Sequence, residues 1–166
     1  MKRKVIIMIF ITITIVLCGL YLHYENTKLQ VSNYKIVNNN IPVDFNNYKI
    51  VQISDFHNNQ SNTLTNDLIK EIEKQKPNII VLTGDFIDSS KTNVEVAMNF
   101  IKKINTVAPI YYVSGNHEAS VKSYTKIKEQ LAENKVVILE NKKEELNEGE
   151  LRDKIEDLSF IYHEFN

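Results

Sequence analysis

The chain has 166 residues, of which 43% are hydrophobic and 25% are charged. This length accommodates one domain and an appendage, and the composition is that of a folded protein, which excludes disorder over most of the chain. The formal net charge of −1 and the single cysteine exclude a general basic field for nucleic acid, a disulfide framework and a cysteine metal site.

The first 22 residues predict a transmembrane segment. Lys2-Arg3-Lys4 precedes an uncharged apolar run, Val5 to Leu22, which is long enough to cross a hydrocarbon core of about 30 Å as a helix. The basic flank predicts that the amino terminus stays in the cytoplasm and that the rest lies outside the cell membrane. A cleaved signal peptide is the main alternative, but the sequence shows no small-x-small cleavage site. An uncleaved, single-pass signal anchor is therefore expected.

Beyond a polar linker at residues 23–33, strand-like and helix-like patterns alternate. The strand-like runs are rich in β-branched and aromatic residues, whereas apolar residues recur at helical spacing between them. Thr92 followed by Glu95 is a capping-box pattern, and the run at 78–84 is typical of a strand buried on both faces. Such alternation predicts βαβ units in a layered α/β domain. Strands are expected at 33–37, 48–54, 78–84, 109–115 and 135–140, and helices at 64–72, 92–104 and 121–131.

The residues after Asn141 have a different composition, because they are acidic and favour helix. We interpret them as an amphipathic helix with one solvated face. The predicted organisation is a cytoplasmic basic flank, a transmembrane signal anchor, a linker, an α/β domain and an acidic helical tail, at residues 1–4, 5–22, 23–33, 34–141 and 142–166.

Two polar clusters follow the predicted strands at 48–54 and 78–84. Asp55 and His57 are alternate residues of an extended chain, so their side chains point to the same side and can hold one ion. Gly84 permits a sharp exit from the next strand, which places Asp85 at its tip. The Asp85 carboxylate could there bridge two cations through its two oxygens. Asp88 is expected to cap the loop or to accept a supporting hydrogen bond.

The third cluster, Gly115 to Glu118, follows the strand at 109–115. The carbonyl oxygen of Asn116 is a neutral, hard ligand that adds no charge to an anionic site. His117 is suited to proton transfer because the unperturbed imidazole pKa is about 6.5. Glu118 is expected either to orient that histidine or to cap the next helix.

The ordered set Asp-x-His, Gly-Asp-x-x-Asp and Gly-Asn-His-Glu resembles the motifs of the calcineurin-like metallophosphoesterases, over residues 48–141. With its apolar amino terminus, the chain is similar to the membrane-anchored bacterial branch of that family. The resemblance implies a four-layer α/β sandwich with two divalent cations, manganese, iron or zinc. Asp55 and His57 would bind the first metal, Asp85 would bridge both, and Asn116 would bind the second.

The same resemblance implies a function. His117 would contact the substrate phosphate and protonate the leaving group, while two cations would lower the pKa of a bridging water and neutralise developing charge. The expected substrates are phosphoesters or pyrophosphates, including UDP-2,3-diacylglucosamine-type lipid precursors. No nucleic-acid partner is expected, and the oligomeric state is not predicted.

The sequence departs from the family pattern near its end. The family completes its site with a further histidine and a Gly-His-x-His motif, but this chain has only His163, within "FIYHEFN". We therefore expect the amino-terminal portion of a truncated sandwich, with one cation or none. Two alternatives stay open: a degenerate, inactive membrane protein that retains a partial metal site, and an interaction module whose segment Lys142 to Phe165 docks a partner or a second copy.

Overall fold

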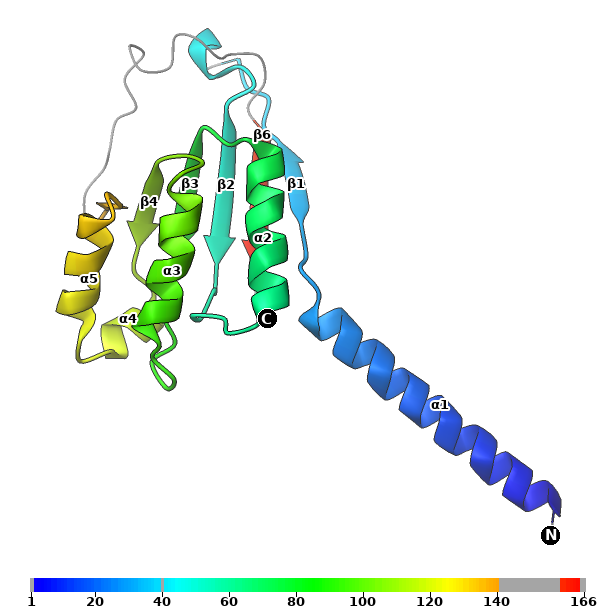
Figure 1. Ribbon diagram of the computed structural model, residues 1–166. Coiled ribbons are helices and arrows are strands. Elements are labelled where there is room, and N and C mark those ends of the chain that lie inside the picture. The colour runs from blue at the N-terminus through cyan, green and yellow to red at the C-terminus, as the bar shows by residue number, and fades with distance from the viewer. Residues whose placement is uncertain (1, 40, 141–158, 165–166) are drawn as a thin grey trace.

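The computed structural model describes residues 2–39, 41–140 and 159–164, the last of these through its backbone. A mixed six-stranded sheet carries three helices on one face, and a long amino-terminal helix extends away from it (Figure 1). The strand order is β1-β6-β2-β3-β4-β5, with β1 antiparallel to β6 and all other neighbours parallel. The expected α/β class is confirmed.

Most predicted elements are present, with bounds that differ by a few residues. The helices are α1 (Lys2–Thr27), α2 (Asn62–Gln75), α3 (Val94–Ile104), α4 (Asn116–Ser120) and α5 (Tyr124–Glu133), with a 3-10 turn, η1, at Val43–Phe45. The strands are β1 (Ser32–Lys35), β2 (Lys49–Ser54), β3 (Ile79–Thr83), β4 (Ile110–Val113), β5 (Val137–Ile138) and β6 (Ser159–Glu164).

The helices share one face because β2, β3, β4 and β5 follow one another in a single direction across the sheet. Right-handed crossovers between parallel strands then place every connecting helix on the same side, where Figure 1 shows α2, α3 and α5. The core lies between these helices and the sheet, and its strand residues are at most 1% exposed: Val51, Ile53, Ile80, Leu82, Ile110 and Tyr112.

The opposite face of the sheet is less buried. Val81 and Thr83 of β3 are intermediate in exposure, and the Thr83 hydroxyl accepts a 2.7 Å hydrogen bond from the Gln52 amide. β3, which was expected to be buried on both faces, is therefore fully buried only on the face that the helices cover.

Side-chain caps set the starts of two helices. The Ser61 hydroxyl accepts the Leu64 N–H at the start of α2, and the Asn93 side chain accepts the Val96 N–H at the start of α3. The predicted cap at Thr92 is therefore wrong by one residue. The Thr92 hydroxyl instead donates to the Asp88 carbonyl, because the loop before α3 folds back on itself.

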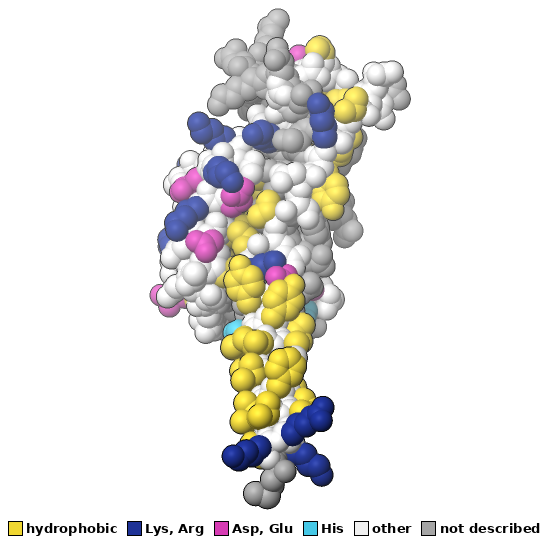
Figure 2. All heavy atoms as spheres, turned by 90° about the vertical axis from the view of Figure 1, so that its right-hand side faces the viewer, with side chains coloured by type: hydrophobic (Ala, Val, Ile, Leu, Met, Phe, Trp, Pro, Cys, Tyr) yellow, Lys and Arg dark blue, Asp and Glu magenta, His cyan; other side chains and the backbone are white. Residues whose placement is uncertain are grey.

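The amino-terminal helix is longer than the apolar run that predicted it. Residues 23–27, expected to be linker, continue α1, so four residues separate it from β1. Its apolar side chains are exposed along its length, with Lys and Arg side chains gathered at its end (Figure 2). By length and composition α1 can cross a membrane. The Thr12 and Thr14 hydroxyls donate to backbone carbonyls within the helix, which suits apolar surroundings.

The predicted helical tail is wrong for Ser159–Glu164, which form β6 between β1 and β2. Its run of Phe, Ile and Tyr has β propensity that the acidic residues before it obscure. Residues 141–158 and 165–166, including most of the proposed docking segment, lie outside the described residues.

The core predicts a stability effect at α3. The Phe100 ring is 1% exposed and stacks on the Phe56 ring at 4.4 Å between centroids. We expect Phe100→Ala to lower the free energy of unfolding by about 3–5 kcal/mol, measured by urea denaturation. The exposed neighbour Asn99 supplies the control, because Asn99→Ala should change it by less than about 0.5 kcal/mol. Equal effects of both variants would contradict this packing.

Candidate metal and active site

The loops after β2, β3 and β4 are joined by backbone hydrogen bonds. Asp55 N–H donates to the Gly84 carbonyl at 3.2 Å, His57 N–H to the Asp85 carbonyl at 2.9 Å, and Gly84 N–H to the Val113 carbonyl at 3.1 Å. The parallel hydrogen-bond ladder thus continues past the strand ends. As a result, the three predicted motifs meet at the carboxyl edge of the sheet, where open α/β sheets bind their ligands.

Aromatic side chains anchor these loops in the core. Phe56, between Asp55 and His57, is 1% exposed and stacks on Phe86 at 5.2 Å. Phe86 directly follows Asp85 and is equally buried. Because the rings point into the core, the polar neighbours on each side are held at the surface of the edge.

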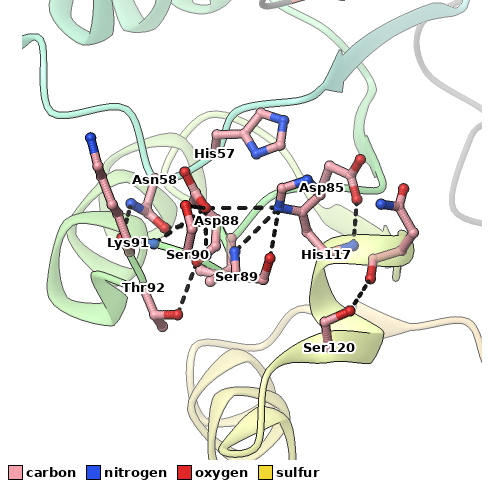
Figure 3. Close-up of polar contacts among 12 residues, drawn as sticks. His57, Asn58, Asp85, Asp88, Ser89, Ser90, Lys91, Thr92, His117 and Ser120 are labelled. Atoms are coloured by element: carbon pink, nitrogen blue, oxygen red, sulfur yellow. Dashed lines mark hydrogen bonds and ion pairs between the residues drawn. The ribbon is translucent and has the colours of Figure 1, made fainter.

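Three candidate ligands converge there. His57, Asp85 and His117 each offer a ligand atom, and these atoms all lie within 4.8 Å of one another. The two imidazole rings meet edge to face, with centroids 4.5 Å apart, and Figure 3 shows all three side chains. Imidazole and carboxylate donors suit zinc, iron or manganese. The donor set therefore fits a divalent cation.

The other two predicted ligands lie at the margin of this group. Asp55 Oδ1 is 3.8 Å from His57 Nε2, and its second carboxylate oxygen accepts the Ser54 hydroxyl. Asn116 is exposed at the first position of α4. The structure thus brings together His57 and Asp85 from the predicted ligands and adds His117, which the sequence assigned to proton transfer.

Glu118 joins the β3 loop to the β4 loop. Its side chain is fully buried. One carboxylate oxygen accepts the N–H groups of Gly115 and Asp85 at 2.8 and 3.0 Å, and the other accepts the Ile87 N–H at 2.8 Å. The Gly115 bond caps the start of α4, one of the two roles expected. Three charge-assisted hydrogen bonds offset the desolvation of a buried carboxylate, so Glu118 fixes both loops.

Two glycines allow these loops to touch. Gly84 has a φ of +90°, and a Cβ there would lie 3.2 Å from Gly115 Cα. A Cβ on Gly115 would overlap the Asp85 carboxylate and stand 2.5 Å from the Asp85 nitrogen. The contact brings the His117 N–H to Asp85 Oδ1, 3.0 Å away. Only glycine at position 115 leaves room for Asp85 as it stands.

The edge also concentrates unusual backbone conformations. Asp55, His57, Asn58 and Asp85 have φ between 39° and 54°, in the left-handed region that non-glycine residues adopt rarely. Each such residue costs on the order of 1–3 kcal/mol and persists where surrounding contacts fix it. Such strain clusters at functional sites.

Asp88 supports the loop, as expected. Its Oδ1 accepts the Ser90 hydroxyl and the Ser90 N–H, both at 2.7 Å. These bonds lower the pKa of Asp88 to about 2, so the carboxylate is ionised at neutral pH. The same oxygen lies 3.8 Å from His117 Nδ1.

The hydrogen bonds of His117 indicate its tautomer. The Ser89 N–H donates to His117 Nδ1 at 3.2 Å (Figure 3). A backbone N–H cannot accept, so the neutral ring carries its proton on Nε2. In this neutral form, the Nε2–H is the group that the ring presents to a bound substrate.

Sequence reasoning missed Asn58. This side chain is 2% exposed. Its oxygen accepts the Asp88 N–H at 2.8 Å, and its nitrogen donates to the Lys91 carbonyl at 3.0 Å. It thereby ties the β2 loop to the β3 loop. Its position directly after His57 is the only indication of this role in the sequence.

Parallel strands with carboxylates and imidazoles gathered at their carboxyl ends are typical of α/β proteins that bind a divalent cation there. A family profile described as calcineurin-like phosphoesterase matches residues 48–164, and the chain belongs to that metal-dependent family. The match extends past residue 141 to include β6.

Three similar proteins bear names from the same family. The chain is 31% identical over 107 residues to an uncharacterized metallophosphoesterase of Aquifex aeolicus, covering 62% of this chain and 40% of that protein. It is 30% identical to one of Campylobacter jejuni, covering 69% and 32%. It is 31% identical to YkuE of Bacillus subtilis, covering 58% and 35%. The matched segment thus covers less than half of each relative.

The glycine contact predicts a loss of metal affinity. Gly115 has a φ of −104°, which alanine tolerates, so Gly115→Ala acts by displacing the Asp85 carboxylate. We expect the Mn²⁺ dissociation constant, measured by calorimetry, to rise at least ~10-fold, or about 1.4 kcal/mol. Gly19→Ala is the matched control, because its Cβ would meet nothing within 4 Å. Unchanged affinity in Gly115→Ala would show that Asp85 does not bind the metal.

The buried carboxylate predicts a loss of stability. Glu118→Gln places an amide NH₂ against backbone N–H donors, and each donor left unsatisfied costs about 1–3 kcal/mol. We expect the urea midpoint to fall accordingly, without a change in the denaturant slope. The same substitution at exposed Glu129 on α5 serves as control. If Glu118→Gln were as stable as Glu129→Gln, Glu118 would not join the loops.

Proposed function

We propose that this chain is a membrane-anchored, metal-dependent phosphoesterase that hydrolyses phosphoester or pyrophosphate bonds. The convergence of His57, Asp85 and His117 at the carboxyl edge of the sheet carries the proposal. Membership of the calcineurin-like phosphoesterase family supports the reaction class.

The proposed metal-binding residues are Asp55, His57, Asp85 and Asn116. When bound, divalent cations supply a hydroxide nucleophile at neutral pH and neutralise charge that develops on the phosphoryl oxygens. The position of Asp85 is restrained, because Glu118 accepts both its own N–H and the N–H of Ile87, two residues further on. We propose manganese, iron or zinc as the metal.

His117 is proposed to act on the leaving group. As the imidazolium, His117 can donate its Nε2 proton to the departing alkoxide and become the neutral ring, with the remaining proton on Nδ1 facing Ser89 Oγ at 3.2 Å and Asp88 Oδ1 at 3.8 Å. Glu118 and Asp88 are proposed to position the loops that carry the reacting groups.

We place the α/β domain on the outer side of the cell membrane, with Val5–Leu22 as the anchor and the amino terminus in the cytoplasm. The exposed apolar surface of α1 and the basic residues at its start support this arrangement. A lipid precursor of the UDP-2,3-diacylglucosamine type is the finer substrate that we propose.

A second candidate function is a non-enzymatic membrane protein that retains a partial metal site. The small donor set favours it, because among the described residues three His or acidic side chains converge. Calorimetry would then give at most one weak Mn²⁺ site, and His117→Ala would have no phenotype.

Hydrolysis of bis(p-nitrophenyl) phosphate distinguishes the two. We expect the full chain to cleave it only with Mn²⁺ or another divalent cation, and Asp85→Asn to abolish cleavage. His117→Gln should lower kcat about 10²–10⁴-fold while the Mn²⁺ affinity stays within about 2-fold of the parent chain. Asp67→Asn, at an exposed position of α2, is the matched control.

Two results would contradict the proposal. A folded chain that binds Mn²⁺ and cleaves nothing would favour the non-enzymatic function. A large loss of Mn²⁺ affinity in His117→Gln would make His117 a ligand in place of the proton donor.

A further inference from the structure

The strand pairing determines which end of the sheet lies next to the amino-terminal helix. It is the end formed by the carboxyl ends of the parallel strands, which is called the site edge here because the candidate site lies there. Ser32, the first residue of β1, pairs with Tyr162 of β6, and Tyr162 pairs with Gln52 of β2. The start of β1 therefore lies level with the end of β2, shortly before Asp55. Because β1 is antiparallel to β6 and β6 is parallel to β2, the chain that leads back from Ser32 to α1 runs toward the site edge.

The connection to the helix is short and held in place. Residues 28–31 join α1 to β1 and span at most roughly 18 Å when extended. Leu29 packs against the hydrophobic core, and the Lys28 N–H donates to the Tyr24 carbonyl, which continues the last turn of α1. The end of α1 therefore stays close to the domain.

The distance across the sheet between β1 and β2 is small as well. One strand, β6, separates β1 from β2, so the chain leaves the sheet about 10 Å from the end of β2. Figure 1 shows α1 departing from the end of the sheet where the arrowheads of β2 and β4 and the short helix α4 lie. The opposite edge, with the loops before β3 and β4, is the one farther from α1.

We infer that the candidate active site faces the surface of the bilayer that holds α1, and that its substrate is a phosphoester in the headgroup layer of that membrane. This inference rests on the proposed anchor and on the proposed hydrolytic function. An anchor that leaves from the site edge through four residues keeps that edge near the lipid surface.

This edge carries charges of both signs. In the loops at 84–93 and 114–123, the exposed charged side chains are Lys91 and Lys122, each of which contributes about 1 kcal/mol of attraction close to an anionic surface. The partly exposed carboxylates of Asp55, Asp85 and Asp88 lie on the same edge and oppose that attraction, so the inference rests on the strand topology and the short connection.

Energy transfer to the membrane tests the orientation without any need for activity. The full chain, with Cys18→Ser, receives one donor dye at Ser123→Cys on the site edge or at Thr106→Cys on the opposite edge, both exposed positions. It is reconstituted into phosphatidylcholine vesicles that contain acceptor-labelled headgroups. We expect transfer to be clearly more efficient from position 123, because the length of α3, roughly 17 Å, separates the two edges. Equal or reversed efficiencies, or a chain that does not float with vesicles, would overturn the inference.

A spacer tests the substrate class. Ten Gly and Ser residues inserted between Gln30 and Val31 should free the domain from the surface. We expect at least a ~10-fold loss of cleavage of a p-nitrophenyl phosphodiester with a long acyl tail in these vesicles, and no change for the same diester without the tail. Equal retention of both activities would overturn the lipid substrate. A chain that cleaves neither diester would overturn the proposed function and this substrate class, while the energy transfer still decides the orientation.

Discussion

The arrangement of the candidate site depends on one buried carboxylate. Glu118 accepts three backbone N–H groups, two from the β3 loop and one from the β4 loop. Hydrogen bonds to an ionised acceptor are stronger than neutral ones, and a buried carboxylate without them would be costly. The position of Asp85 therefore follows from a residue that is not itself part of the converging group of His57, Asp85 and His117.

Other contacts also hold the loops of the site in place. Gly84 and Gly115 let two backbones approach, while Phe56 and Phe86 anchor their loops in the core. Strained φ values at Asp55, His57 and Asp85 persist because these contacts determine the backbone on both sides. Preorganisation of this kind aims ligand atoms at a common point before any ion binds.

Much of the fold was predictable from sequence because its elements have strong local signals. Helix periodicity and apolar strand runs predicted α2, α3, α5 and the strands β2 to β4. The tail shows the limit: the short run that forms β6 follows an acidic segment, and its place between β1 and β2 is a long-range pairing that no local pattern specifies. The extension of α1 to Thr27 was missed for a related reason, because polar residues 23–27 continue a helix that is already nucleated.

The candidate site was predictable to the level of motifs. The ordered clusters placed Asp55, Asp85 and His117 at strand ends, and the family resemblance inferred from those clusters is confirmed by the family profile. Contacts between the loops could not be predicted from the sequence. The hydrogen bonds from Asn58 to Asp88 and Lys91, for example, depend on tertiary packing. For Glu118 the sequence offered two roles, and the structure selects the cap and adds the bonds to the β3 loop.

Anomalous diffraction from crystals of the full chain grown with Mn²⁺ tests the central claim most directly. The claim is that the loops held by Glu118 form a divalent-cation site around His57 and Asp85. It predicts an anomalous peak about 2.0–2.2 Å from a carboxylate oxygen of Asp85 and from a ring nitrogen of His57. Ordered loops with no peak at that position, or a peak bound only elsewhere on the chain, would contradict it.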